Sequence, residues 1–210
     1  MNILVIGAGG RVGNKLIKGL LEDGHQVTGT SRRKEKLFNS PNYKQIALEV
    51  TDSLEEIEKG IPNETQAIYF VTGSRGEDLL KVDLHGAVKT MQAAENKNIK
   101  RFVLLSALYS MEPDKWKSIM DYYTAKYFAD LYLIHQTNLD YTILQPGHLV
   151  ESEGSGKITI DERQMRIEGQ NSIQNVADAL KEVLDKSNTF KKAIPMLDGD
   201  VPIAEAISNL

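Results

Sequence analysis

The chain begins with a buried-strand pattern that runs directly into a glycine-rich turn. Residues 2–6 (NILVI) form an almost uninterrupted apolar run, which is typical of a strand covered on both faces. Residues 7–13 (GAGGRVG) follow at once, and apolar residues then recur at helical spacing, at Val12, Leu16, Ile17, Leu20 and Leu21. A strand, a glycine turn and a helix in this order predict an α/β fold whose first turn binds a phosphate-bearing ligand.

The glycines of this turn have the spacing G-x-x-G-x-x-G, at Gly7, Gly10 and Gly13. Gly7 lets the chain leave the strand through dihedral angles that a side chain would hinder. Gly9 and Gly10 keep side chains away from the amides that would face a pyrophosphate, and Gly13 lets the helix pack closely on the sheet. The first amides of a helix have no intrahelical acceptor, so an anion is stabilised there. The alternative is a tight turn without a ligand, and we predict nucleotide binding.

Length, charge and cysteine content exclude several classes of protein. The 210 residues suit a single nucleotide-binding domain over 1–210, in which 148–210 form a small substrate-side elaboration. A net charge of −4 gives no reason to expect nucleic acid or a membrane surface as partner. The absence of cysteine excludes disulfides and thiol nucleophiles, and the histidines lack metal-ligand spacing, so we expect no metal. No apolar run approaches a membrane span, so we expect a cytoplasmic protein, and a homodimer is left open.

Strand and helix patterns alternate along the chain, which predicts a doubly wound parallel sheet with strand order 3-2-1-4-5-6. The expected strands are residues 2–6, 26–30, 43–48, 67–71, 101–105 and 140–144. After the first helix we expect one with Ser53 as N-cap that runs through Lys59, a second over 78–96 and a third over 121–136. The buried face of the helix over 78–96 should carry Leu80, Leu84, Ala87, Val88 and Met91. In the last third we expect strands at 157–160, 163–167 and 191–196, and helices at 175–186 and 203–207.

Ligands of such sheets bind at the carboxyl ends of the strands. That rule selects one rim, formed by residues 7–13, 31–33, 71–74, 106–108 and 146–149. We therefore expect the cofactor to contact a set of rim residues beyond the glycine turn, namely Val12, Val71, Thr72, Gly73, Pro146, Gly147, His148 and Leu149.

The residues after the second strand indicate which nucleotide binds. An NAD site would place an acidic residue here to accept from the ribose hydroxyl, whereas this chain has Ser31, Arg32 and Arg33. Basic side chains suit a 2′-phosphate, so we expect NADP(H) rather than NAD(H), although the same residues could be a solvated start to the next segment. Arg11 could also reach a phosphate, and Glu49 could accept from the adenine amino group; either could simply face solvent.

A Tyr-x-x-x-Lys motif supplies the catalytic candidates, Tyr122 and Lys126. Positions i and i+4 of a helix share a face, and a lysine ammonium near a phenol lowers the pKa of that phenol. Such a tyrosine can donate or accept the proton that accompanies hydride transfer, and Ser106 could bond the same oxygen. The alternative is that the aromatic residues here are core, with Tyr123, Tyr127 and Tyr132 as candidates for that packing.

With these motifs in place, the sequence resembles an atypical member of the short-chain dehydrogenase/reductase superfamily, of the small NAD(P)H-binding type. The resemblance covers nearly the whole chain, through GAGGRVG at 7–13, TSRR at 30–33, VTGS at 71–74, the segment 83–107, YYTAK at 122–126 and LDYTILQPG at 139–147. It implies a Rossmann fold, with Ser106, Tyr122 and Lys126 as the catalytic set and His148 and Leu149 beside the nicotinamide. Two positions depart from the family pattern: Asp83 lies where many members have asparagine, and Gln145 lies where many have arginine.

Three functions follow from this interpretation. The first is an NADPH-dependent oxidoreductase acting on a small carbonyl, quinone or flavin-like substrate. The second is a non-catalytic sensor of the NADP(H) ratio with a protein partner. The third is an epimerase that keeps its nicotinamide bound, for which the chain after residue 147 offers little sequence to build a sugar-nucleotide pocket. Residues 107–119, with Met111 and Trp116, are expected to form either an apolar lid over the substrate or a dimer contact.

Overall fold

The computed structural model describes residues 1–210, and its centre is a sheet of nine strands in the order β11-β8-β10-β6-β5-β4-β1-β2-β3. The strands of this sheet are β1 (Asn2–Ile6), β2 (Gln26–Thr30), β3 (Tyr43–Ile46), β4 (Ala67–Phe70), β5 (Arg101–Leu105), β6 (Asp140–Pro146), β8 (Lys157–Thr159), β10 (Lys192–Asp198) and β11 (Val201–Pro202). The α-helices are α1 (Arg11–Glu22), α2 (Leu54–Gly60), α3 (Ala87–Asn96), α4 (Met120–Gln136), α5 (Ile173–Glu182) and α6 (Ile203–Ser208). Short helical turns lie at Pro113–Lys115 (η2), Glu162–Gln164 (η3) and Ser187–Thr189 (η4).

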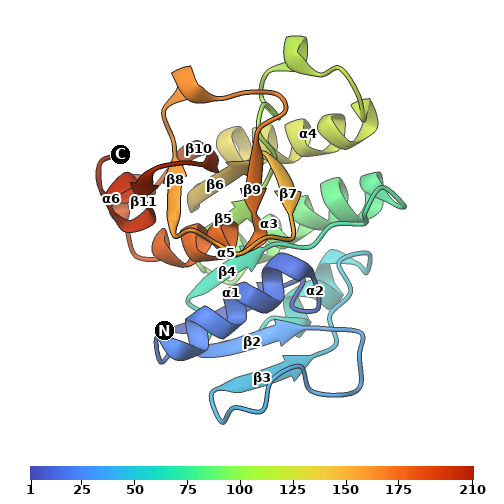
Figure 1. Cartoon of the computed structure of the whole chain (residues 1–210). Helices are drawn as coiled ribbons and strands as arrows, with labels where there is room; N and C mark the ends of the chain where they lie inside the picture. The colour runs from blue at the N-terminus through green and yellow to red at the C-terminus, as the bar shows by residue number, and fades with distance from the viewer.

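The parallel part of the sheet has the predicted order 3-2-1-4-5-6 and is the Rossmann arrangement (Figure 1). β1 pairs in parallel with β2 and β4, and β5 pairs in parallel with β4 and β6. The strand predicted over 191–196 is β10, which joins the sheet in parallel beside β6. β8 and β11 extend this edge in the antiparallel direction, while β7 (His148–Val150) and β9 (Gln170–Ser172) form a separate pair that the sequence did not predict.

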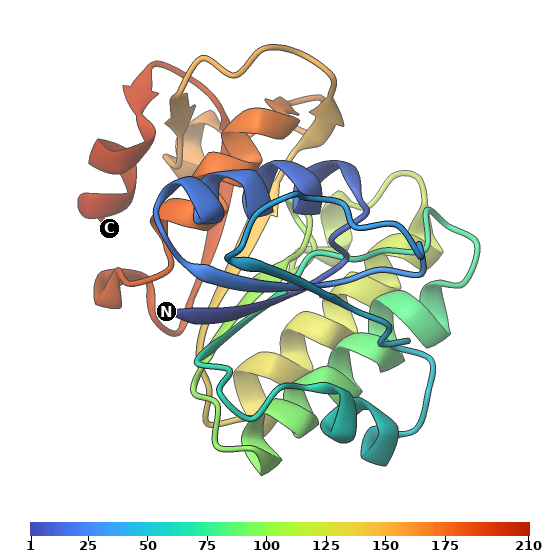
Figure 2. The ribbon, with the colours of Figure 1, turned by 90° about the horizontal axis from the view of Figure 1, so that it is seen from below.

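Helices cover both faces of the sheet, and the first strand shows why (Figure 2). Alternate residues of β1 point to opposite faces, so Ile3 and Val5 enter the core beneath α1 and α5, whereas Leu4 and Ile6 enter the core beneath α2, α3 and α4. All four side chains are at most 2% exposed. A strand that is buried on both faces needs the uninterrupted apolar run found at the start of the chain.

The helix expected over 78–96 is split, and one predicted core residue is wrong. Residues Leu79–Gly86 form a π-helical segment (η1) that continues into α3. A π-turn holds more residues than an α-turn, so the side chains of η1 are rotated about the axis relative to the face that α3 buries. As a result Leu80 is 67% exposed, while Asp83 faces the interior at 2% exposed. Ala87 and Met91 are buried as predicted, whereas Leu84 and Val88 are only half-buried.

Side-chain hydrogen bonds determine two further features, the start of α2 and the absence of one predicted strand. The expected N-cap is present, because the backbone amide of Glu56 donates to Ser53 Oγ at 3.2 Å. The strand expected over 163–167 is absent, and η3 lies there instead. Asp161 accepts from the backbone amide of Arg163 at 3.0 Å and from its guanidinium at 2.9 Å and 2.8 Å. Such side-chain bonds stabilise a turn in competition with an extended strand.

A buried polar network fixes the chain after β6 against α5. The Asn175 amide donates to Asp198 Oδ1 at 2.8 Å, and the backbone amide of Ser172 donates to Asp198 Oδ2 at 2.8 Å. The backbone amide of Gly147 donates to Asn171 Oδ1 at 2.7 Å. These bonds position residues 147–150 at the carboxyl edge of the sheet, next to the glycine turn. None of the helices is both long enough and apolar enough to cross a membrane.

Candidate nucleotide-binding and catalytic site

The glycine turn is shaped by close backbone contacts that leave no room for side chains. Gly7 has φ +102°, and a Cβ atom there would lie 2.7 Å from the backbone nitrogen of Thr72. The Gly10 amide donates to the Gly7 carbonyl at 3.0 Å. A Cβ atom on Gly13 would collide with the same carbonyl oxygen. Gly13 therefore brings the first turn of α1 directly against the end of β1.

The turn forms an open cradle at the start of α1. Gly9 is exposed, and only Ser31 Oγ, at 3.8 Å, comes within 4 Å of a Cβ atom placed there. The first helical hydrogen bond is donated by Asn14 to Gly10, so the amides of 11–13 precede the helical bonding pattern. No side chain caps α1, and no acidic residue lies in its first turn. These features fit the pyrophosphate of a dinucleotide, which needs donors and no competing carboxylate.

The basic residues after β2 are exposed and take part in no ion pair. The backbone amide of Arg33 donates to Ser31 Oγ at 3.1 Å, and the Gln45 amide donates to the Arg33 carbonyl at 2.7 Å. These bonds hold the loop while the guanidinium groups of Arg32 and Arg33 face solvent. Arg11, by contrast, lies 3.4 Å from Glu151 in an exposed ion pair.

The other predicted cofactor contacts follow neighbouring strands at the same edge. Among them Val71 and Pro146 are buried, Val12 is buried in the core, Glu49, Thr72 and Leu149 are half-buried, and Gly73 and His148 are exposed. The loop after β4 is held by Asp83, whose Oδ2 accepts from the Ser74 amide at 2.9 Å. The Ser74 hydroxyl is buried without a partner, which leaves a polar atom free for a ligand at this rim.

Tyr122 and Lys126 share a face of α4, as their spacing predicts, but the lysine points toward Asp83. Lys126 is 5% exposed, and its Nζ lies 3.7 Å from Asp83 Oδ1 and 3.3 Å from the Leu105 carbonyl. The same nitrogen is 5.7 Å from the centre of the Tyr122 ring. The Tyr122 hydroxyl has no hydrogen-bond partner within the chain, so it is free to bond a ligand. The positive charge of Lys126 is therefore already balanced by the buried carboxylate of Asp83.

Ser106 is engaged by an acidic residue that the sequence analysis missed. Ser106 is 3% exposed, and its hydroxyl donates to Asp130 Oδ2 at 2.7 Å. Ser110 donates to the same oxygen at 2.6 Å, and the Gln145 amide donates to Ser110 Oγ at 2.8 Å. Burial raises the pKa of Asp130 to about 6. In the sequence, one signal pointed to Asp130: it follows Lys126 by four residues, which places it on the same helix face as the Tyr-x-x-x-Lys motif.

The segment 107–119 packs against the outer part of α4. The Trp116 ring stacks on Tyr123 at 5.6 Å between centroids, and its indole N–H donates to the Tyr109 carbonyl at 2.8 Å. Tyr123, Tyr127 and Tyr132 are half-buried. Tyr132 packs against the core, as the alternative interpretation expected, whereas Tyr123 and Tyr127 pack around Trp116. Burial raises the pKa of Tyr123.

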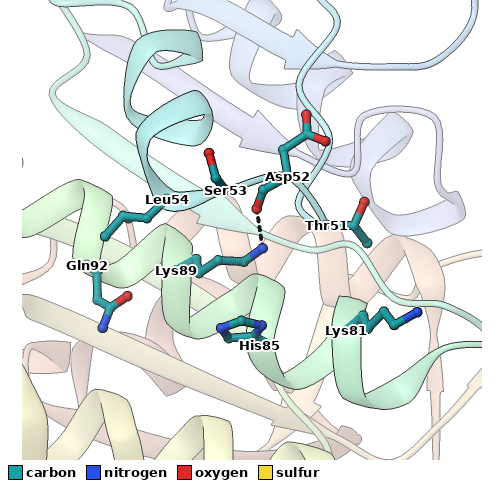
Figure 3. Close-up of a pocket in the computed structure, with 8 residues that line it drawn as sticks. All are labelled: Thr51, Asp52, Ser53, Leu54, Lys81, His85, Lys89 and Gln92. Atoms are coloured by element: carbon teal, nitrogen blue, oxygen red, sulfur yellow. Dashed lines mark hydrogen bonds between the residues drawn. The ribbon is translucent and has the colours of Figure 1, made fainter.

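One cavity lies outside this rim, between the start of α2 and the η1–α3 helix (Figure 3). It has a volume of about 550 Å³, and Leu54 is its one apolar lining residue. Lys81, His85 and Lys89 project from successive turns of the helix, and the Lys89 ammonium donates to the Asp52 carbonyl. None of the predicted site residues lines it, and an open polar depression lacks the apolar walls typical of a substrate pocket. The candidate site is therefore the rim at the carboxyl ends of the strands.

Comparison with known proteins agrees with this geometry. The model of the NAD(P)H-binding family matches residues 7–187. The chain belongs to this NAD(P)H-binding family. The uncharacterized sugar epimerase YhfK of Bacillus subtilis is 33% identical over 219 residues, covering 100% of both chains. The crystal structure of the oxidoreductase ylbE from Lactococcus lactis is 43% identical, with a TM-score of 0.94 over 100% of this chain and 96% of that one.

A more distant structure shares the fold of this NAD(P)H-binding protein. A short-chain dehydrogenase/reductase of the wide type from Veillonella parvula, in complex with NADP, is 18% identical. Its TM-score is 0.76, over 96% of both chains. The family match makes this chain an NAD(P)H-binding protein, and the structural likeness shows that the fold is shared.

Replacing Gly13 by alanine should disrupt the cradle. The added Cβ would meet a backbone oxygen that cannot move away, so we expect a loss of about 1–3 kcal/mol in the free energy of unfolding and weaker NADPH binding. Gly19→Ala is the matched control, because its Cβ would meet only the Lys181 side chain, at 3.0 Å, in the same helix. Urea unfolding and fluorescence titration measure both effects, and equal behaviour of the two variants would contradict the assignment.

The raised pKa of Asp130 predicts a specific pH dependence of stability. The folded state holds this proton more tightly than the unfolded state, so the contribution of Asp130 to stability falls as pH rises from about 4 to about 6. Asp130→Asn removes that titration, so the stability of this variant relative to the wild type should rise by up to about 3 kcal/mol over this range. Urea unfolding at several pH values measures it. Asp121→Asn, an exposed position of the same helix, is the control.

Proposed function

We propose that this chain is an NADPH-dependent reductase acting on a small carbonyl, quinone or flavin-like substrate. The observation that carries the proposal is that the donor-lined glycine cradle and the first turn of α4, which carries Tyr122, both lie at the carboxyl edge of the parallel strands. The bound nicotinamide would supply the hydride. The chain supplies the proton, from the Tyr122 hydroxyl to the substrate oxygen.

The preference for NADPH rests on charge at the end of β2. Arg32 and Arg33 are exposed and free of ion pairs, and no acidic residue stands in the place that would accept from a ribose 2′-hydroxyl. A 2′-phosphate would bring its charge to two unpaired guanidinium groups. The Veillonella parvula relative, which is in complex with NADP, is consistent with this assignment.

Lys126 would hold the cofactor ribose and position the tyrosine. Its ammonium is held between Asp83 and the Leu105 carbonyl, so its position is set before the cofactor binds. Lys126 and Tyr122 are one helical turn apart, and the ammonium lies 5.7 Å from the centre of the phenol ring. Preorganised groups of this kind need no rearrangement when charge develops on the substrate.

A sensor of the NADP(H) ratio is the second candidate, and one observation favours it. Asp83 already balances the charge of Lys126, and Ser106 already donates to Asp130, so both groups are engaged within the chain. A protein that only binds the nucleotide needs the cradle and the basic loop alone. An epimerase, as the name of the Bacillus subtilis relative says of that protein, would need a sugar-nucleotide pocket beyond residue 147.

Arg32→Ala should weaken NADPH binding selectively. Loss of one charge-assisted contact should raise the dissociation constant for NADPH by about 10- to 150-fold and leave that for NADH nearly unchanged. Lys36→Ala, an exposed lysine of the same loop, is the control. Fluorescence titrations at constant salt measure both constants. An equal loss for the two nucleotides would contradict the assignment of the 2′-phosphate.

Tyr122→Phe should abolish turnover while NADPH still binds. Removing a proton donor lowers kcat by about 100- to 10,000-fold, and the phenyl ring preserves the packing. NADPH oxidation is followed with a quinone, a flavin and an aldehyde, and Tyr127→Phe on the same helix is the control. Unchanged activity in Tyr122→Phe would remove the tyrosine from the mechanism. Tight NADPH binding by the wild type without oxidation by any of the three would support the sensor.

A further inference from the structure

Three ionisable side chains occupy successive turns of one face of α4. They are Tyr122, Lys126 and Asp130, four residues apart, and their burial increases along the helix from half-buried to 5% and then 0% exposed. The proposed function uses the first two. The third, at the buried end of the row, has no role in it, although its carboxyl group touches the strand-end serine.

The Asp130 carboxyl group is satisfied on one oxygen only. Oδ2 accepts from Ser106 at 2.7 Å and from Ser110 at 2.6 Å, whereas Oδ1 is buried without any partner. Buried carboxylates normally have hydrogen bonds on both oxygens. A bare oxygen penalises the charged form far more than the neutral acid, because only the charged form loses strong hydration there.

The surroundings of this carboxyl group carry little compensating charge. Lys126, on the same helix, is paired with Asp83 from η1. The segment after β5 contributes the neutral hydroxyls of Ser106 and Ser110, and β6 contributes the neutral amide of Gln145, which donates to Ser110 at 2.8 Å. No cation forms an ion pair with Asp130. The group therefore lies where a neutral acid and a carboxylate are close in free energy.

We propose that Asp130 is a positioning residue that sets the direction of the Ser106 hydroxyl, and through it the hydrogen bond that Ser106 offers to the substrate oxygen. This inference rests on the proposed function. When Asp130 is ionised, it accepts the Ser106 proton as a hydrogen bond, and Ser106 presents only lone pairs to the cleft. When Asp130 is protonated, its own O–H donates to Ser106 Oγ, and the serine O–H is free to donate to a substrate carbonyl.

The direction of this bond decides which substrate state is stabilised. A carbonyl oxygen that gains negative charge during reduction is stabilised by a donor and repelled by lone pairs. The protonated form of Asp130 therefore favours reduction of a carbonyl, and the ionised form favours binding of an alcohol, whose O–H needs an acceptor. No covalent bond changes at Asp130, and the proton that titrates it comes from solvent.

The test compares pH profiles of carbonyl reduction. In the wild type, kcat/KM should fall by about 10- to 100-fold between about pH 5.5 and about pH 8, the size of one hydrogen bond to a charged oxygen. Asp130→Asn cannot titrate, so its profile should lose this fall. Ser106→Ala removes the hydroxyl and should give the same flat profile, with the rate at about pH 5.5 lowered. If kcat/KM of Asp130→Asn falls with pH as steeply as that of the wild type, the proposal is overturned.

An infrared measurement on the protein without cofactor separates this inference from the proposed function. A protonated carboxyl band that disappears as pH rises, is absent from Asp130→Asn, and changes frequency in Ser106→Ala would support the switch, because the frequency reports the Ser106 bond. Absence of the band, or an unchanged frequency in Ser106→Ala, would overturn it. Failure of the wild type to oxidise NADPH with any substrate would refute only the proposed reductase, and the infrared result would still decide the state of Asp130.

Discussion

The whole cofactor edge depends on one backbone contact, the close approach of Gly13 in α1 to the Gly7 carbonyl at the end of β1. Nothing larger than hydrogen fits between them. This contact sets the angle at which α1 leaves the sheet, and so the place at which its free amides meet a ligand. Gly7 also lies against Thr72, so the first turn meets the loop after β4. The parallel strands end at this edge, and the turn and the loop therefore belong to one rim.

A second constraint is the buried pair of Asp83 and Lys126, which connects η1 to α4. The exposed Leu80 and the buried Asp83 both lie in η1, so the ion pair to Lys126 starts from the irregular part of this helix. Asp83 also binds the Ser74 amide, and Lys126 also binds the Leu105 carbonyl. Breaking a buried pair by removing one partner is costly, because the other charge then lies uncompensated. The loops after β4 and β5 are thus held to the same two helices.

Much of this arrangement could be predicted, and the exceptions have physical causes. Strand and helix patterns alternate along the chain, and this alternation predicted the strand order. The rim followed from that order, because parallel strands end at one edge of the sheet. The outward turn of Leu80 could not be foreseen, since a π-turn depends on tertiary contacts and leaves no periodic signal in sequence. Asp161 replaced an expected strand by a turn through a side-chain bond that competes locally with the backbone. Asp130 was not predicted, because the sequence alone does not distinguish a buried helical carboxylate from one on the helix surface.

The order in which the chain is synthesised gives the position of α5 a consequence for folding. The face of the sheet beneath α1 is completed only by residues 173–182, and Tyr69 on β4 donates its hydroxyl to the Leu180 carbonyl there, at 3.0 Å. β10, which flanks β6, comes later still. A nascent chain therefore carries a nearly complete nucleotide-binding half with an uncovered apolar face until residues 173–198 have left the ribosome. During that interval the uncovered face makes the chain prone to aggregation.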